Sequence, residues 1–125
     1  MEIIKVNEFL RVCDELANKP INIKTAYKLA KLRASLQSEA DFYNSKLQSI
    51  IQKYGEVDEE GNFIFTDNGN GVKIKSDMLS ACQAEVDELE NLDIAKPDIR
   101  FSLDEFDGFD LTLAQTTSLL DFIED

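Results

Sequence analysis

The chain has 125 residues and a mass of 14.1 kDa, the usual size of one domain, and 43% of its residues are hydrophobic. It contains no His and only two Cys, so catalysis by histidine and zinc sites built from His and Cys are excluded. Its net charge of −12 argues against sequence-independent binding of nucleic acid through a basic face.

The charge is distributed unevenly along the sequence. Residues 1–75 contain 11 acidic and 11 basic residues, whereas residues 76–125 contain 14 acidic and only two basic residues. No acidic residue occurs between Glu15 and Glu39, and five basic residues fall there. The sequence therefore combines a basic segment in a neutral first part with an acidic second part. The five basic residues are Lys19, Lys24, Lys28, Lys31 and Arg33.

Residues 1–21 predict an N-terminal helix, with a short edge strand as a possibility at residues 2–6. Asn7 is a suitable N-cap, apolar residues follow at helical spacing, and Lys19-Pro20 ends the helix. Residues 22–55 predict a long helix, because Asn22 is a second N-cap and the next Gly or Pro is Gly55. At 1.5 Å per residue this helix is about 45 Å long.

The long helix carries two apolar positions that repeat every seven residues. This spacing is typical of a coiled coil or an antiparallel helical hairpin, although Arg33 interrupts it. Two interpretations remain open, a core helix of a small helical domain and a self-associating coiled coil. The first repeat is Leu29, Leu36, Tyr43 and Ile50, and the second is Ala26, Arg33, Ala40, Leu47 and Tyr54.

Residues 56–75 predict a β-hairpin. Residues 62–66 and 72–75 alternate apolar and polar side chains, and residues 67–71, Asp-Asn-Gly-Asn-Gly, are typical of a tight connection. Because an isolated hairpin is marginally stable in water, we expect it to join another strand or to pack on helices.

The remaining sequence predicts an acidic helix over 76–91 and an acidic C-terminal segment over 92–125. Residues 99–103 alternate as a strand that can pair with the hairpin, and two capping boxes begin short helices at Ser102 and Thr112. The expected fold is thus one mainly helical α+β domain, residues 1–125, in which the second helix packs back on the long helix. A small antiparallel sheet and short C-terminal helices complete it.

No motif in the sequence identifies a catalytic or metal site. The acidic loop 56–67 resembles a calcium loop in spacing, but it lacks the bidentate Glu and the second helix of such a loop. The glycines of residues 68–71 lack the Lys and the following helix of a phosphate loop. We therefore expect no enzymatic activity and no cofactor. The N-terminal residues do not resemble a signal peptide, and no apolar run is long enough to predict a membrane partner.

The C-terminal segment is the strongest candidate for an interaction surface, because it interleaves large apolar residues with carboxylates. The aromatic residues are either core, with the acids as a solvated outer face, or part of a surface that engages a basic partner. Such a surface can imitate the phosphates of a nucleic acid or bind the basic segment of a second subunit. The candidate binding residues are Asp104, Glu105, Asp107, Asp110, Phe106 and Phe109, together with Lys24, Lys28, Lys31 and Arg33.

Several stretches resemble small uncharacterised proteins encoded by tailed phages and prophages of Gram-positive and gut bacteria. These stretches are residues 23–32, 46–62, 70–75, 99–106, 111–113 and 122–123. The resemblance implies a viral origin and a non-enzymatic role, but it brings no catalytic residues. It favours a protein made in the host-cell cytoplasm, with incorporation into the virion left open.

Three functions follow from these observations. The favoured one is a phage protein that acts in virion structure or assembly through contacts with itself or with other phage proteins. The alternative is an acidic nucleic-acid mimic that inhibits a basic host protein of defence or nucleic-acid binding. An enzyme is the third, and it requires a buried carboxylate with a raised pKa.

Overall fold

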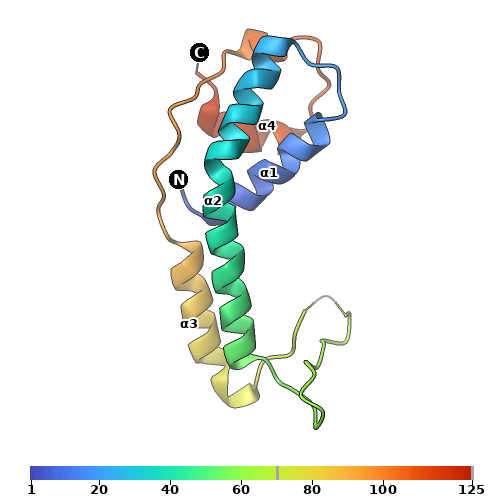
Figure 1. The fold of residues 1–125 in the computed structure, drawn as a ribbon, viewed down its shortest axis with the longest axis vertical. Helices are drawn as coiled ribbons and strands as arrows, with labels where there is room; N and C mark the ends of the chain where they lie inside the picture. The colour runs from blue at the N-terminus through green and yellow to red at the C-terminus, as the bar shows by residue number, and fades with distance from the viewer. Residues whose placement is uncertain (70, 125) are drawn as a thin grey trace.

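The computed structural model describes residues 1–69 and 71–124, and the chain is mainly helical over this range. Its centre is the long helix α2, whose first half contacts α1 and the C-terminal segment and whose second half contacts α3 (Figure 1). The α-helices are α1 (Ile4–Leu16), α2 (Ile23–Tyr54), α3 (Leu79–Glu90) and α4 (Leu113–Leu119). Short 3₁₀ turns span Ser76–Met78, Leu103–Phe106 and Leu120–Phe122.

The predicted long helix is confirmed by α2, which contains 32 residues and is therefore about 48 Å long. Asn22 caps it as expected, since its side-chain oxygen accepts a hydrogen bond of 2.8 Å from the backbone N–H of Lys24. The apolar seam of this helix packs against other helices of the same chain. Its residues Leu29 and Leu36 are buried toward α1, and Tyr43 is buried toward α3.

Gly55 ends α2, but not through the left-handed conformation that glycine often adopts at a helix end. Its φ is −65°, which any residue adopts. The position requires glycine because a Cβ there would lie 2.6 Å from the carbonyl oxygen of Ile51 and 2.8 Å from the ring of Phe63. Close approach of the 55–75 segment to the helix end thus explains this residue.

The main core lies where α1 crosses the first half of α2. Phe9 of α1 and Phe122 of the C-terminal segment contact each other with ring centroids 5.0 Å apart. Phe101 and Phe106 contact each other in the same core at 5.3 Å. Phe101, Phe106 and Phe122 are therefore core residues, as in the first of the two interpretations of this segment. Further members of this core are Val6, Val12, Leu16, Leu29, Leu32, Leu36, Ala40 and Leu119.

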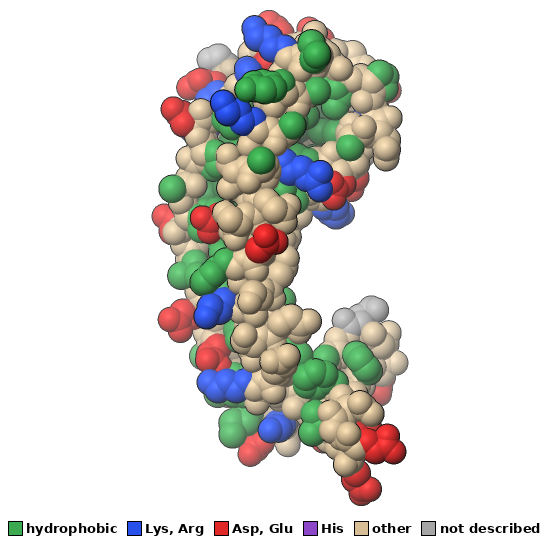
Figure 2. Space-filling model, in the orientation of Figure 1, with side chains coloured by type: hydrophobic (Ala, Val, Ile, Leu, Met, Phe, Trp, Pro, Cys, Tyr) green, Lys and Arg blue, Asp and Glu red, His purple; other side chains and the backbone are tan. Residues whose placement is uncertain are grey.

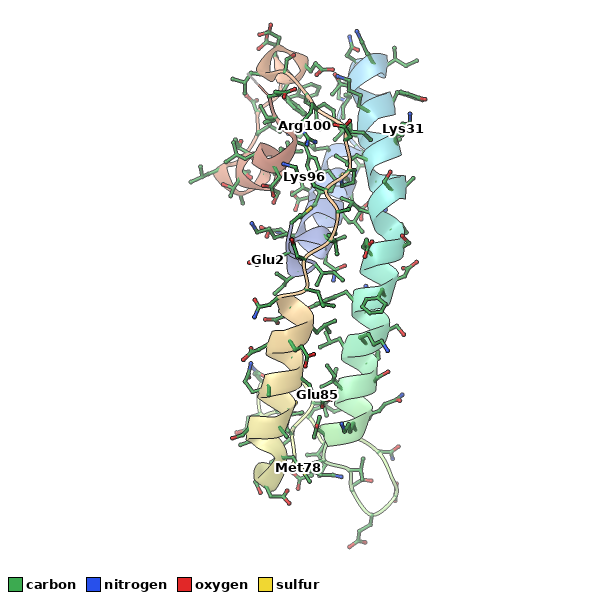
Figure 3. All side chains as sticks on the ribbon, turned by 90° about the vertical axis from the view of Figure 1, so that its left-hand side faces the viewer. Glu2, Lys31, Met78, Glu85, Lys96 and Arg100 are labelled. Atoms are coloured by element: carbon green, nitrogen blue, oxygen red, sulfur yellow. The ribbon has the colours of Figure 1, made fainter. Side chains whose placement is uncertain are left out.

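A second and smaller core joins α3 to the second half of α2. It consists of Ile3, Tyr43 and Leu89, with Leu47, Ile50 and Ile94 packed against them. After α3, residues 91–101 run in an extended path along α2 back to the α1 end (Figures 1 and 3). The backbone of residues 1–3 is bound to the start of this path, with Ile3 N–H donating to the Leu92 carbonyl at 2.9 Å. The edge strand that the sequence allowed at residues 2–6 is wrong, because α1 begins at Ile4.

The predicted β-hairpin at 62–75 and the small antiparallel sheet are wrong. Over residues 1–69 and 71–124 no segment forms a strand; within the 55–75 segment only isolated bridges occur, at Gly55–Ile74, Val57–Phe63 and Phe65–Val72. Asn70 of the predicted connection lies outside the described residues.

The backbone hydrogen bonds of the 55–75 segment explain why no ladder forms. Glu56 N–H donates to the Lys73 carbonyl (2.7 Å), Lys73 N–H donates to the Ile64 carbonyl (2.7 Å), and Ile64 N–H donates to the Glu56 carbonyl (2.9 Å). These bonds join three short extended stretches, around Glu56, Ile64 and Lys73, to one another. The backbone pairing is therefore shared among three stretches (called arms below) and does not continue along any two of them as a ladder. The segment also buries its apolar side chains only in part, and Phe65 is 62% exposed.

The predicted strand at 99–103 is also wrong. Phe101 forms one parallel bridge, to Ile123, at the opposite end of α2 from the 55–75 segment (Figure 1). Burial of the Phe101 side chain in the main core fixes this position, and the segment is too far from residues 62–75 to pair with them. The short C-terminal helices are confirmed. At the start of α4, Thr112 and Gln115 exchange the two hydrogen bonds of a capping box, at 3.0 and 3.1 Å.

Candidate functional site

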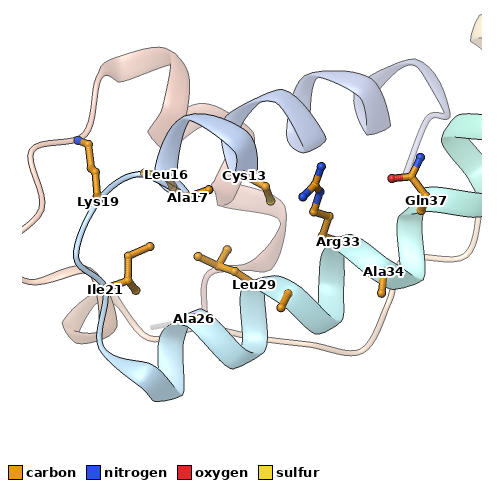
Figure 4. Close-up of a pocket in the computed structure, with 11 residues that line it drawn as sticks. Cys13, Leu16, Ala17, Lys19, Ile21, Ala26, Leu29, Arg33, Ala34 and Gln37 are labelled. Carbon is orange, nitrogen blue, oxygen red and sulfur yellow. The ribbon is translucent and has the colours of Figure 1, made fainter.

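A groove of about 550 Å³ lies between the second half of α1 and the first half of α2 (Figure 4). The side chains of Cys13 and Leu16 from α1 and of Leu29 from α2 are directed into it, and Ile21 borders it from the connection between the helices. Three alanines form part of its wall along α2. The remaining lining residues are Ala17, Lys19, Ala26, Ala30, Arg33, Ala34 and Gln37.

The sequence of α2 explains why this groove stays open. Ala26, Ala30 and Ala34 are four residues apart and therefore occupy one face of the helix, where their small side chains cannot fill the space beside α1. Two large apolar residues on the same side of the helix, Ile23 and Tyr27, are 86% and 65% exposed. The first three turns of α2 thus present an apolar face that the described part of the chain leaves exposed.

Both charged residues that line the groove are basic. Arg33 points from α2 toward α1 and forms an ion pair with Asp14 at 2.7 Å, with both side chains about half exposed (Figure 4). Lys19 donates a hydrogen bond of 2.7 Å to the backbone carbonyl of Asp110. That acceptor is a neutral carbonyl, and Lys19 forms no ion pair with residues 1–69 or 71–124.

Cys13 lies in the wall of the groove with only 8% of its surface exposed. Burial raises the pKa of its thiol to about 11, although Arg33 nearby acts in the opposite direction. The thiol is therefore protonated at neutral pH and is a weak nucleophile. It contributes apolar surface to the groove and no reactive group.

The structure brings the predicted basic and acidic candidates together within one chain. Lys28 Nζ lies 2.8 Å from Glu105 Oε1 and donates a hydrogen bond of 3.0 Å to Oε2. Glu105 also accepts the backbone N–H of Ser102 at 2.8 Å. The hydrogen bond from Lys28 lowers the pKa of the Glu105 carboxyl, and the bond from Ser102 adds to this effect. This pair therefore fixes the C-terminal segment to α2.

The other predicted binding residues differ in their surroundings. Phe106 is buried in the main core, and Phe109 is half-buried against it. Asp104, Asp107 and Asp110 are exposed.

Of the predicted basic residues, Lys31 is exposed with its ammonium group 5.8 Å from the ring centroid of Tyr27, and Arg33 lies at the groove. Lys24 shares a surface hollow of about 420 Å³ with Asp104, Glu105, Asp107 and Phe109.

The carboxylates of the acidic second part do not form one surface. Those of α3 lie beside the second half of α2, whereas those of residues 98–124 lie at the α1 end (Figures 1 and 2). Asp125 of the predicted acidic segment lies outside the described residues. The excess of acidic residues in the second part of the sequence is therefore separated in the structure into two groups, one near each end of α2.

No chemistry of a metal site is offered by the described residues. Over residues 1–69 and 71–124, no three His, Cys, Asp or Glu side chains gather as potential ligands. None of the helices in this range is both long enough and apolar enough to span a membrane. The expectations of no enzymatic activity, no cofactor and no membrane partner stay predictions.

The groove itself was not predicted from the sequence. Its signal is the spacing of Ala26, Ala30 and Ala34 beside Ile23 and Tyr27, which together make an apolar strip on the predicted long helix. The seven-residue repeat included Ala26 and Arg33 but assigned them to a seam that a partner helix covers.

Comparisons with protein-family models, with curated proteins and with solved structures find no match to this chain. The resemblance to small phage and prophage proteins therefore stays an expectation.

Proposed function

We propose that this protein is a non-enzymatic phage protein that acts in virion structure or assembly by binding another phage protein in the groove between α1 and α2. The observation that carries the proposal is the groove of about 550 Å³ beside the first turns of α2, which is lined mainly by apolar residues and left open by residues 1–69 and 71–124. Exposed apolar surface of this kind, beside residues as open as Ile23, is typical of protein interaction sites.

The shape and charge of the groove favour one kind of ligand, an acidic amphipathic helix. An amphipathic helix binds by placing its apolar face in a hydrophobic groove, and the small side chains of Ala26, Ala30 and Ala34 leave room for it here. Lys19, which bonds a neutral carbonyl at one end of the groove, and the absence of acidic residues from α2 before Glu39 favour a helix that carries carboxylates on its outer edges.

The resemblance to phage and prophage proteins supplies the biological setting of the proposal. Under it the protein is made in the host-cell cytoplasm, and its partner is another phage protein, with or without entry into the virion. Neither direct contact with nucleic acid nor contact with a membrane is part of the proposed role.

Affinity capture from phage-infected cells, read by quantitative mass spectrometry, tests the proposal. We expect the unaltered protein to recover a phage protein and A30E/A34E to recover at least tenfold less of it, because two carboxylates on the groove wall repel an acidic helix. Ala30 and Ala34 are exposed, so the substitutions leave the core intact.

S35E/S45E is the matched control, since it adds the same charge to exposed positions of α2 that do not line the groove. It should recover the partner as the unaltered protein does. Equal recovery by A30E/A34E and by the control would refute the groove as the binding site, and recovery of no phage protein by any form would refute the proposed function.

The nucleic-acid mimic has less support from the geometry. Of the carboxylates proposed to replace phosphates, Glu105 is held by Lys28 at 2.8 Å and is mostly covered, so only Asp104, Asp107 and Asp110 are free to face a basic protein.

A further inference from the structure

A second groove, of about 320 Å³, runs between α3 and the second half of α2. It lies on the part of the molecule that consists of only two helices. Apolar side chains form its floor and charged side chains form its two edges. Its lining residues are Phe42, Lys46, Ser49, Ile50, Lys53, Glu85, Glu88, Leu89 and Leu92.

The two helices cover each other incompletely. Of the 12 residues in α3, only Cys82 and Leu89 are buried. Phe42 of α2 and Leu92 just beyond α3 remain 44% and 40% exposed at the groove. Neither α1 nor the 55–75 segment covers it, because both project from α2 on the side away from α3 (Figure 1). The packing of α3 on α2 thus leaves a strip of apolar side chains exposed at the bottom of this groove.

The two edges of the groove carry opposite charges. Lys46 and Lys53 lie on the α2 edge, and Glu85 and Glu88 lie on the α3 edge. Figure 2 shows basic, acidic and hydrophobic side chains next to one another over these helices, and Figure 3 shows Glu85 between α3 and α2. Lys53 contacts Glu85 at 3.2 Å, whereas Lys46 and Glu88 form no ion pair within residues 1–69 and 71–124.

This arrangement of charge is complementary to itself. In a two-fold dimer, if one residue faces a second residue on the other copy, that second residue also faces the first across the axis. If the two-fold axis runs parallel to the helices, the α2 edge of one copy faces the α3 edge of the other. If the axis is perpendicular to the helices, lysine faces lysine and glutamate faces glutamate. Only the parallel axis therefore brings opposite charges together.

We propose that a second copy of this chain docks on the groove between α2 and α3, with the two-fold axis parallel to the helices. The lysine edge of each copy then faces the glutamate edge of the other, and Phe42, Ile50 and Leu92 of both copies are covered between them. The four helices form a short bundle. The contact is separate from the groove between α1 and α2 and does not depend on the proposed function.

The size of the contact sets the expected affinity. An α3 of 12 residues is about 18 Å long, and two helices side by side are about 20 Å wide, so each copy covers roughly 360 Å² of flat area. Contacts of this size are weak and transient. The net charge of −12 per chain also opposes association at low ionic strength. We expect a dissociation constant on the order of 10–100 μM at about 0.15 M salt.

Two charge-reversed forms of the full chain test the proposal by sedimentation equilibrium. K46E/K53E has an entirely acidic groove, and E85K/E88K has an entirely basic one. Each alone should be monomeric up to about 1 mM, because like charges face each other across the two-fold axis. An equimolar mixture of the two should dimerise at least as tightly as the unaltered protein, since every facing pair then has opposite charge.

A second mixture separates this contact from general attraction between acidic and basic proteins. D77K/D87K adds two lysines at exposed positions that do not line the groove, so it keeps the unaltered groove and dimerises through it. Its mixture with K46E/K53E should contain no more dimer than D77K/D87K forms alone at the same concentration. Circular dichroism verifies that each variant retains its helices. The proposal is overturned by any of three results: the unaltered protein is monomeric up to about 1 mM, the two charge-reversed forms do not dimerise when mixed, or K46E/K53E increases the amount of dimer as much when added to D77K/D87K as when added to E85K/E88K. The groove variant A30E/A34E should dimerise normally, so failure of this contact and failure of the proposed function are distinguishable.

Discussion

The carboxylate of Glu105 connects the C-terminal segment to α2 by an ion pair with Lys28. Its carboxylate receives Lys28 and the backbone N–H of Ser102, and these bonds hold its pKa below the usual 4.5. A carboxyl whose pKa is lowered on folding stabilises the folded state above the unfolded-state pKa. That stabilisation is lost as the pH falls through the folded-state pKa.

E105Q should lower the free energy of unfolding at pH 7 by about 1 kcal/mol, because glutamine keeps the oxygen that accepts from Ser102 but removes the charge. Urea unfolding at pH values from 7 to 3 measures the effect. The difference from the unaltered protein should shrink below about pH 4.5 as Glu105 itself is protonated. D104N, at an exposed neighbouring position, should change the stability by less than about 0.5 kcal/mol. A difference between E105Q and the unaltered protein that does not vary with pH would contradict the assigned ion pair.

Gly55 is required by contact and not by backbone conformation, which gives a second test at the scale of one residue. G55A places a methyl group 2.6 Å from the Ile51 carbonyl and 2.8 Å from the Phe63 ring, so we expect a loss of about 1–3 kcal/mol in the free energy of unfolding. G71A is the matched control, because a Cβ at Gly71 meets no atom within 4 Å. Equal stability of the two variants would show that the 55–75 segment does not press on the end of α2.

Among the elements, α2 could be predicted from the sequence almost to the residue, whereas the 55–75 segment could not. A helix is specified locally: Asn22 supplies the cap, the next 32 residues contain no Gly or Pro, and the Leu29–Leu36 spacing marks the buried face. The pairing of extended segments depends on which backbone groups meet. Alternation in residues 62–66 does not show that Glu56 also forms backbone hydrogen bonds with Ile64 and with Lys73.

Hydrogen exchange distinguishes the three-arm arrangement from a hairpin. Amides of residues 62–66 and 71–75 should exchange at least a hundredfold faster than those of residues 29–43 in α2, because isolated bridges on an exposed segment open without unfolding of the core. Protection of these residues equal to that of α2 would show a cooperative ladder and would contradict the structure.

The groove between α1 and α2 could not be predicted from the sequence either, because it depends on how two elements pack against each other. The sequence marks Ala26, Ala30 and Ala34 as one helix face, but whether another element covers that face depends on how α1 crosses α2. Similarly, the acidic and basic segments were proposed to meet between molecules, and Lys28 with Glu105 shows that they meet within one. Charge asymmetry along a sequence does not specify where the charges lie in space.

At the scale of the whole molecule, α2 separates two surfaces with different properties. The α1 end has the larger apolar groove with basic residues, and the α3 end has a smaller groove with one basic and one acidic edge. We infer that the first surface binds a different protein and the second binds a second copy. A chain with both contacts can link its partner into a two-fold assembly.

The most direct test of the central claim is site-specific photo-crosslinking in phage-infected cells. With p-benzoylphenylalanine in place of Ala30, irradiation should produce a covalent adduct with one phage protein, since this position lies on the groove wall. The same probe at Ser35, exposed on α2 but outside the groove, should produce at least tenfold less of that adduct. Equal adduct formation at both positions, or none at Ala30, would contradict binding of a phage protein in the groove between α1 and α2.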